Sequence, residues 1–362
     1  MQPCSALEVR PLAARRFPGL PKFSNHVSST PELAYMNFAN YIKDIGRGAN
    51  SAGDLSEQDA HQLFGAMLDG GVPELELGAI LIALRVKSES LPELLGFYSA
   101  LSERLFRLRA PSGKAKPIVL PSYNGARHQP NLLPLLALLL QRFGVPVLIH
   151  GPLTGNGRIA TAYILRELGV MPSATLAQAQ EALDQGSIAF VPTAVLAPGL
   201  TDLLSLRGRL GVRSSAHSLA KLMDPFETES LRIVSVSHPP YLELMREFLL
   251  ATSAHALLLR STEGEAFANP KRRPRIEYFK DAAGQILFEA EAGPLKSIPT
   301  LPAAIDAVTT AAWIKGTLVG EAPVPLPIVN QLACCLYASG YTSDMNQAKA
   351  IVAVETGSLA AA

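Results

Sequence analysis

The sequence predicts an α/β protein with a small all-helical N-terminal domain and a larger domain in which strands and helices alternate. Residues 36–109 carry helix-start signals and helical apolar spacing. From Pro117 onward, short apolar runs alternate with helical segments, which is the order of an open sheet covered by helices. With 48% hydrophobic and 17% charged residues, the chain has the composition of a globular protein with a sizeable core.

The first 35 residues differ from the rest of the chain. They contain proline, serine and arginine without a sustained period, so we expect a disordered leader or an artefact of start-codon choice in residues 1–35. The folded part is expected to begin near Met36, where MNFANYIKDIGRG starts like an amphipathic helix. Three more helices are predicted in the helical domain, and each has its own start signal: Ser56 with Asp59, Pro73, and Ser90 with Glu93.

The larger α/β domain is expected to cover residues 115–362. Its strand candidates are residues 118–120, 145–150, 188–192, 231–237, 255–261, 275–279 and 285–290. Helices are predicted between most of these strands, and three glycines are expected to end helices: Gly144, Gly169 and Gly186. Residues 302–357 are predicted to be helical again.

The composition argues against a membrane-spanning or secreted protein. The longest apolar run, Leu132 to Leu140, is too short to span a bilayer and is interrupted by Pro134. No early stretch has the composition of a secretory signal. The cysteines, Cys4, Cys334 and Cys335, suit neither a disulfide nor metal-ligand spacing. We therefore expect a cytoplasmic protein without a membrane partner.

The net charge is only +1, but the basic residues are clustered. Residues 104–116 contain five basic residues and no acidic one. Residues 207–221 contain four basic residues with His217 and no acidic one, and residues 271–280 contain five against a single glutamate. Because binding of a polyanion depends on the local field, these stretches are candidates for contact with a phosphate backbone. The competing interpretation of an isolated basic loop is a solvated loop without a ligand.

Two strand ends carry glycine turns of the kind that bind phosphate. The stretch PIVLPSYNGARHQP (117–130) reads as an apolar strand, a turn at Asn124-Gly125 and the start of a helix. The strand of residues 145–150 ends at His150-Gly151, and three further candidates precede the next helix: Gly155, Gly157 and Arg158. A phosphate cradle uses more glycines than this turn has, so a plain turn and a phosphate site both stay open. Both strand ends are expected to lie side by side at one edge of the sheet.

Several longer strings carry a family resemblance. A small helical domain followed by a sheet with ligand loops at these places is similar to the anthranilate phosphoribosyltransferase fold, which implies a mixed, mostly parallel sheet covered by helices. Residues 207–213 resemble the segment that carries that family's anthranilate-contacting arginine. The closer resemblance is to a branch of that family, the YbiB-type DNA-binding proteins. It covers residues 37–345 and rests on IGRG (45–48), LELGAILIALRVK (75–87), IVLPSYNGAR (118–127), GVRSSAHSLAKL (211–222), VSHP (236–239) and TEGEAFANPKRRP (262–274).

The resemblance allows the enzyme's chemistry to be checked position by position. The enzyme family binds a phosphorylated ribose pyrophosphate with magnesium, on a Gly-Thr-Gly-Gly-Asp loop that here is Pro121-Ser122-Tyr123-Asn124-Gly125. Its Lys-His-Gly-Asn-Arg segment becomes residues 149–153, which keep only the histidine and the glycine. Its magnesium-binding Asp-Glu pair is reduced to Glu263 and Glu265, which are not adjacent. We therefore expect no metal and no cofactor, and a degenerate phosphate site made of Ser122, Asn124, Gly125, Arg127, His150, Gly151 and Arg158.

Basic residues replace the enzyme's ligand-binding groups. Together with the family resemblance, they favour a sequence-nonspecific nucleic-acid-binding protein that contacts DNA and RNA backbones. The expected contacts are Arg207, Arg209, Arg213, Lys221, Lys271, Arg272, Arg273 and Arg275. Tyr123 or Phe267 is a candidate for stacking on a base, although core packing is the more frequent role of either. The resemblance also implies a homodimer formed through the helical domains.

An enzyme is the alternative. A glycosyltransferase or phosphorylase that uses a phosphorylated ribose with a different acceptor would keep the same scaffold. Its chemistry would then be carried by His150, Gly151, Arg158 and Arg207. Losses in three separate loops argue against this alternative.

Overall fold

The computed structural model describes residues 36–48, 51–293, 295 and 300–357. The prediction for residues 1–35 lies outside the described residues. Helix formation starts close to Met36, and the helical domain consists of α1 (Phe38–Ile45), α2 (Glu57–Leu68), α3 (Glu74–Lys87) and α4 (Leu91–Glu103).

The helix starts of this domain follow the sequence signals. The Ser56 side chain accepts a hydrogen bond from the Asp59 backbone nitrogen at 3.1 Å and so caps α2. At α4, Ser90 and Glu93 form a reciprocal capping box. The prediction for α3 was displaced by one residue, because Pro73 precedes the first helical residue instead of being it.

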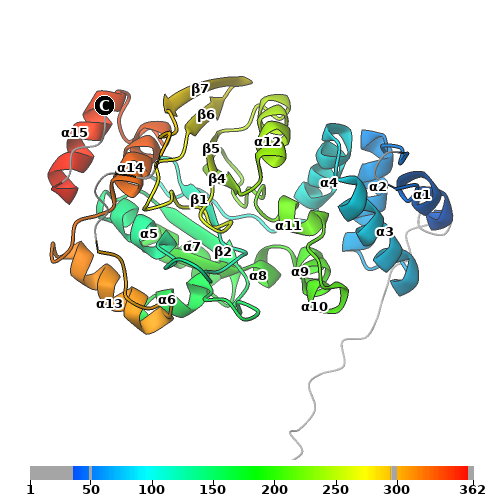
Figure 1. The fold of residues 1–362 in the computed structure, drawn as a ribbon, viewed down its shortest axis with the longest axis horizontal. Coiled ribbons are helices and arrows are strands. Elements are labelled where there is room, and N and C mark those ends of the chain that lie inside the picture. The colour runs from blue at the N-terminus through cyan, green and yellow to red at the C-terminus, as the bar shows by residue number, and fades with distance from the viewer. Residues whose placement is uncertain (1–35, 49–50, 294, 296–299, 358–362) are drawn as a thin grey trace, which may run out of the picture. The chain divides into compact units, whose positions relative to one another are not determined.

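The second part of the chain forms one mixed sheet. Within the described residues the strand order is β3-β2-β1-β4-β5-β6-β7, in which the first five strands are parallel and β6 pairs antiparallel with both β5 and β7. This confirms the predicted mixed, mostly parallel sheet (Figure 1). The strands lie within two residues of their predicted bounds: β1 (Ile118–Pro121), β2 (Val147–Gly151), β3 (Ala189–Pro192), β4 (Leu231–Val236), β5 (Ala256–Arg260), β6 (Ile276–Lys280) and β7 (Ala283–Phe288).

Helices cover the sheet, as predicted. The longer ones are α5 (Leu133–Arg142), α6 (Thr161–Glu167), α7 (Leu176–Asp184), α12 (Pro239–Ala251), α13 (Ala307–Leu318), α14 (Leu326–Ala338) and α15 (Met345–Thr356). Glycines with positive φ follow α5, α6 and α7 at the predicted stops, Gly144, Gly169 and Gly186. The parallel strands β1 to β4 are buried along their whole length, which is why they are nearly continuous apolar runs in the sequence. None of the helices in the described residues is long and apolar enough to cross a lipid bilayer.

Four short helices join the sheet to the helical domain. They are α8 (Thr193–Leu196), α9 (Pro198–Ser205), α10 (Arg207–Leu210) and α11 (Ser215–Leu219). In Figure 1, α9 to α11 lie between the carboxyl ends of the parallel strands and helices α2 to α4. This arrangement brings residues of α3 next to the loops that follow β1 and β4, and these loops carry the predicted site residues.

Candidate functional site

The two predicted glycine turns meet at the sheet edge, as expected. The backbone nitrogen of Ser122 donates to the His150 carbonyl oxygen at 2.8 Å. Gly151 lies so close to the β1 turn that a Cβ there would be 1.9 Å from the Ser122 carbonyl oxygen. A residue with a side chain cannot replace Gly151 without moving the backbone of the β1 turn. The ends of β1 and β2 therefore form one continuous wall.

The hydrogen-bond donors of the β1 turn are already occupied by a carboxylate of the chain itself. Glu265 is only 1% exposed. Its Oε1 accepts from the backbone nitrogens of Asn124 at 2.8 Å and Gly125 at 2.7 Å. Its Oε2 accepts from the Ser122 hydroxyl at 2.6 Å. Consecutive backbone N–H groups of this kind form a nest for an anion, and Glu265 fills this nest from within.

A second carboxylate occupies the next turn in the same way. Glu263 accepts from the backbone nitrogens of His128 at 2.7 Å and Gln129 at 2.8 Å, with a longer bond from Arg127 at 3.1 Å. Gly264, between the two glutamates, has a φ of +93°, and a Cβ there would lie 1.4 Å from Asn124 Nδ2. Only glycine allows this close approach, which presses both carboxylates against the turns.

The two glutamates are engaged by the chain itself. Glu263 and Glu265 accept hydrogen bonds from backbone N–H groups of different turns. Magnesium demands a near-octahedral set of oxygen ligands. Among the described residues, no group of three or more His, Cys, Asp or Glu side chains is arranged to hold a metal ion.

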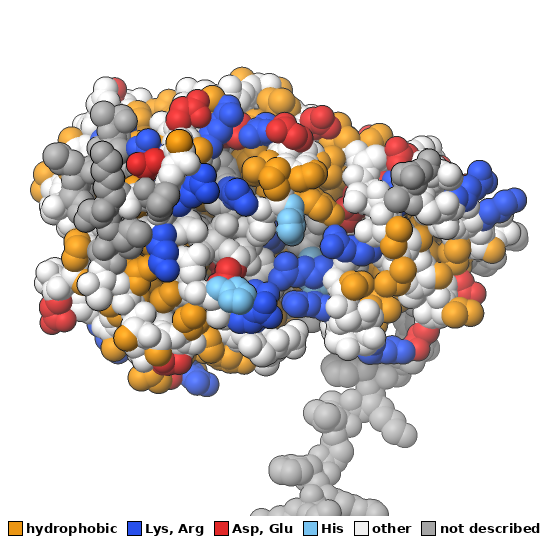
Figure 2. Space-filling model, in the orientation of Figure 1, with side chains coloured by type: hydrophobic (Ala, Val, Ile, Leu, Met, Phe, Trp, Pro, Cys, Tyr) orange, Lys and Arg blue, Asp and Glu red, His pale blue; other side chains and the backbone are white. Residues whose placement is uncertain are grey.

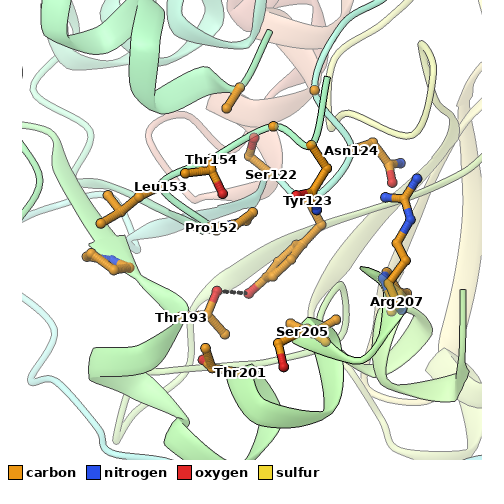
Figure 3. A pocket seen from close by; sticks show the side chains of 18 of the residues that line it. Ser122, Tyr123, Asn124, Pro152, Leu153, Thr154, Thr193, Thr201, Ser205 and Arg207 are labelled. Atoms are coloured by element: carbon orange, nitrogen blue, oxygen red, sulfur yellow. Dashed lines mark hydrogen bonds between the residues drawn. The ribbon is translucent and has the colours of Figure 1, made fainter. Parts of the chain in front are cut away.

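Tyr123 is part of a buried hydrogen-bond chain. Thr193 Oγ1 donates to the Tyr123 hydroxyl at 3.1 Å, and that hydroxyl lies 2.7 Å from His150 Nδ1 (Figure 3). Burial raises the pKa of Tyr123 and lowers the pKa of His150 to about 3, so both groups are neutral and share a hydrogen bond. Phe267 is also fully buried. The suggested stacking of Tyr123 or Phe267 on a base is therefore replaced by packing within the core.

A cavity of about 390 Å³, here called the turn cavity, opens beside Tyr123. Figure 3 shows Pro152, Leu153 and Thr154 on one side, with Ser205 and Arg207 on the opposite side. The walls are mainly apolar or neutral. Arg207 is the only Lys, Arg, Asp or Glu among the described residues that line it.

A smaller cavity of about 110 Å³, the junction pocket, lies where α3 approaches α11 and α12. Asn124 and His217 line both this pocket and the turn cavity, so the two adjoin. Among the described residues, its charged lining consists of Arg85, Arg213 and Lys221 with a single carboxylate, Glu89.

The cations of the junction pocket are poorly compensated. Arg213 makes no ion pair with the described residues, and burial together with Arg207 and Arg158 lowers its pKa to about 10. Burial and the nearby Arg213 lower the pKa of Lys221 to about 8. The Lys221 ammonium donates to the Ser235 carbonyl at 3.1 Å, but it has no carboxylate partner in the described part of the chain. Uncompensated charge inside a cavity is typical of ligand sites.

A third cavity of about 430 Å³, the loop cavity, lies beside residues 269–275. Ser237 lines both this cavity and the junction pocket, so each of the three cavities adjoins the next, and the set is here called the basic trough. Arginines dominate its charged lining, with two carboxylates among them: Arg246, Arg260, Arg272, Arg273, Arg275, Glu263 and Glu277. Figure 2 shows Lys and Arg side chains gathered around the central hollow.

The structure places the predicted nucleic-acid contacts unevenly. Arg207 lines the turn cavity, whereas Arg213 and Lys221 are recessed in the junction pocket. Arg209 is exposed but pairs with Glu74 of α3 at 3.1 Å. Arg246, which was not among the predicted contacts, binds Glu277 through its guanidinium at 2.7–3.0 Å. The remaining four predicted contacts belong to the loop beside the loop cavity: Lys271, Arg272, Arg273 and Arg275.

One basic stretch makes no contribution to the trough. In residues 104–116, Arg104 binds Asp69 through two bonds of 2.7 Å, and Lys116 pairs with Glu229. No residue of this stretch lines the three cavities. Two of the five cations of this stretch are thus neutralised by acids that are distant in the sequence.

Sequence reasoning missed several residues of this region. Arg85 enters the junction pocket from the helical domain, and Arg260 enters the loop cavity from the end of β5. Glu263 and Glu265 were noted only as remnants of a metal pair, and their bonds to the turn amides were not foreseen. The available signal was the T-E-G-E string itself, because a glycine between two glutamates allows both to turn toward one loop.

Comparison with known proteins agrees with this architecture. The helical bundle domain of the glycosyl transferase family matches residues 39–104. YbiB of Escherichia coli K12 is 44% identical over 318 residues, which are 88% of this chain and 99% of YbiB. Anthranilate phosphoribosyltransferase of Methanosphaerula palustris is 26% identical, over 85% of this chain and 92% of that enzyme.

Solved structures share the fold. Anthranilate phosphoribosyltransferase from Thermus thermophilus has a TM-score of 0.69 at 24% identity, over 88% of this chain and 94% of that one. The Saccharomyces cerevisiae enzyme, solved in complex with PRPP and Mg, has a TM-score of 0.66 at 13% identity, over 90% of this chain and 95% of that one. The chain therefore belongs to the family of YbiB and is a homologue of the anthranilate phosphoribosyltransferases, whose scaffold it shares.

Proposed function

We propose that the protein binds the sugar-phosphate backbones of DNA and RNA, without sequence preference, along the basic trough. The supporting observation is that basic residues far apart in the sequence line adjoining cavities. Arg85, Arg213 and Arg273 come from three separate segments of the chain, yet they line two adjoining cavities. A guanidinium can bind a phosphate through two parallel hydrogen bonds, which suits a phosphate backbone.

The basic residues of the loop 271–275 make most of the proposed phosphate contacts. Lys271 and Arg272 are exposed, and Arg273 and Arg275 are partly exposed. Arg272 and Arg273 donate only to backbone carbonyls of residues 289–292, so their charges stay available for phosphate. The Asn269 side chain accepts a hydrogen bond from the Lys271 backbone nitrogen at 2.9 Å and so shapes the loop itself. We expect the basic side chains of the loop to contact the phosphate backbone without sequence preference.

The alternative of a phosphoribosyltransferase with a different acceptor uses the same scaffold. It requires the β1 turn to accept a pyrophosphate. The amides of Asn124 and Gly125 already donate to Glu265, and Tyr123 occupies the wall beside them. We therefore favour nucleic-acid binding over this alternative.

We further propose a homodimer formed through the helical domain, acting in the cytoplasm. Leu75, Ile82 and Val86 of α3 are exposed, Leu75 by 81%, and they lie seven and four residues apart on one helix face. Association through this apolar face removes it from water and joins two troughs into a longer binding surface. Analytical ultracentrifugation of Leu75→Glu should give a monomer where the unaltered protein gives a dimer.

The test of nucleic-acid binding is a salt series with a labelled DNA duplex. For roughly 6–10 phosphate contacts, affinity should fall by about three to five orders of magnitude between 50 and 200 mM salt. The triple variant Lys271→Ala/Arg272→Ala/Arg273→Ala should bind more weakly and lower the salt slope by about 0.9 for each lost phosphate contact.

A matched triple variant serves as the control. Lys114→Ala/Arg166→Ala/Lys280→Ala removes the same charge at exposed positions outside the three cavities. It should bind like the unaltered protein. Equal losses in both triple variants, or an affinity that hardly changes with salt, would refute the proposal.

A further inference from the structure

The junction pocket carries an excess of positive charge that matches one particular kind of anion. With its histidines counted as neutral, three cations and one carboxylate leave a net charge of 2+ among the described lining residues. The carboxylate, Glu89, is engaged by the Tyr241 hydroxyl at 3.4 Å. Burial and neighbouring cations lower the pKa of His217 to about 3, so this ring adds no charge. A phosphate monoester carries a charge of about −2 near pH 7, because its second pKa is about 6.

The size of the pocket agrees with a single phosphate group. At about 110 Å³ it holds a tetrahedral anion but no attached ring system. The turn cavity next to it, at about 390 Å³, has the size and the mainly apolar walls of a site for an organic group. Thr193 and Ser205 supply a few polar groups on those walls. Asn124 and His217 stand at the boundary between the two spaces.

We propose that the junction pocket and the turn cavity together bind a small phosphate monoester of the nucleoside monophosphate class. The phosphate lies among Arg85, Arg213 and Lys221, and the nucleoside lies beside Tyr123 and Leu153 in the turn cavity. This site shares Arg213 with the proposed trough, but monoester binding differs from backbone binding in two respects. Lys221 is recessed below the surface, and a diester in a polynucleotide carries only one negative charge and must leave the pocket in two directions.

The internal occupation of the β1 turn explains why the anion is bound here. Glu265 blocks the backbone nest at Asn124 and Gly125, so an incoming anion finds no free amides there. Arg213 forms no ion pair or hydrogen bond with the described residues, and the charge of Glu265 only partly offsets the neighbouring cations. Its planar guanidinium is free to donate two parallel hydrogen bonds to a phosphate.

The test is isothermal titration calorimetry with three probes: adenosine 5′-monophosphate, inorganic phosphate and adenosine. Adenosine monophosphate should bind most tightly, phosphate more weakly, and adenosine at least tenfold more weakly than its monophosphate. Arg213→Gln and Lys221→Met should each weaken binding of the monophosphate at least tenfold. Arg166→Gln, an exposed arginine on α6, is the control and should leave it unchanged.

Circular dichroism and thermal unfolding show whether each variant is folded, and two independent variants guard against misfolding of one. The proposal is overturned if the monophosphate fails to bind, if adenosine binds equally well, or if both variants bind the monophosphate like the unaltered protein. The DNA titration is a separate measurement on the same protein. Failure there with retained monophosphate binding removes the proposed nucleic-acid function and leaves this site standing.

Discussion

The β1 turn and the junction pocket treat charge in opposite ways, although Asn124 borders both. At the turn, the backbone amides of Asn124 and Gly125 and the Ser122 hydroxyl all donate to one internal acceptor, Glu265. In the pocket, Arg213 and Lys221 form no ion pair with the described residues, and Glu265 acts on both only through its charge. A matched buried charge closes a site, and an unmatched one opposes folding and favours a ligand of opposite sign. The comparison shows how a scaffold can lose one anion site and keep another a few residues away.

The largest expected effect is at the turn. Glu265→Ala leaves the backbone amides of Asn124 and Gly125 without an acceptor, whereas the Ser122 hydroxyl still has Thr161 Oγ1 at 2.7 Å. Since each buried unsatisfied donor costs about 1–3 kcal/mol, the free energy of unfolding should fall by about 4 kcal/mol. Urea denaturation monitored by circular dichroism measures this change.

The matched control is Glu289→Ala, which removes an exposed carboxylate without a side-chain partner in the described structure. Its unfolding free energy should stay within 0.5 kcal/mol of the unaltered protein, roughly the range of surface substitutions. If Glu265→Ala were no more destabilising than Glu289→Ala, the hydrogen bonds from the turn to Glu265 would not contribute to the free energy of unfolding.

The next effect concerns pH and tests both regions together. Burial lowers the pKa of His150, at the turn, to about 3, and the pKa of His217, at the pocket, is also lowered to about 3. In the unfolded chain each of these imidazoles is protonated with a pKa near 6.5. The contribution of each neutral histidine to the free energy of unfolding is therefore complete above pH 6.5 and is lost as the pH falls toward 3. Between pH 7 and pH 5 each histidine should reduce the unfolding free energy by about 2 kcal/mol.

Proton NMR of the imidazole rings measures the pKa of each histidine directly. Both rings should stay neutral in the folded protein at pH 5. Saturating phosphate should raise the pKa of His217 toward its ordinary value and leave that of His150 unchanged, because only His217 borders the proposed anion. A midpoint near 6.5 for either ring in the phosphate-free protein would contradict the assigned burial.

The smallest effect has the opposite sign. Lys221→Met replaces an uncompensated, partly buried ammonium by an apolar group of similar length, so the unfolding free energy should rise by about 1 kcal/mol at pH 7. The informative comparison is Lys87→Met. Lys87 is equally shielded but pairs with Asp54 and, at 2.8 Å, with Glu93, so this variant should be destabilised. Destabilisation by both substitutions would show that the pocket cation is compensated after all.

The fold was predictable because its signals are local. Strand-like apolar runs and glycine stops fixed the order of elements, and the β strands deviate from their expected bounds by two residues at most. The capping serines Ser56 and Ser90 begin α2 and α4 as predicted. The predicted start of α3, at Pro73, is one residue too early, because a proline suits both the position before a helix and its first turn.

The site was less predictable because its contacts join distant segments. Glu265 reaches a turn 140 residues earlier in the chain, and Arg85 approaches Arg213 from another domain. A basic stretch in a sequence also says nothing of the acids that fold against it. Residues 104–116 and 207–221 look alike as strings, yet the charges of Arg104 and Lys116 are neutralised and those of Arg213 and Lys221 are not.

The most direct test of the central contrast is a titration of isotopically labelled protein with inorganic phosphate, followed by NMR. Phosphate should shift the side-chain Nε–H resonance of Arg213 and leave the backbone amides of Asn124 and Gly125 in place, because Glu265 already holds them. Shifts of the Gly125 amide with an unmoved Arg213 resonance would contradict the account and restore the β1 turn as the anion site.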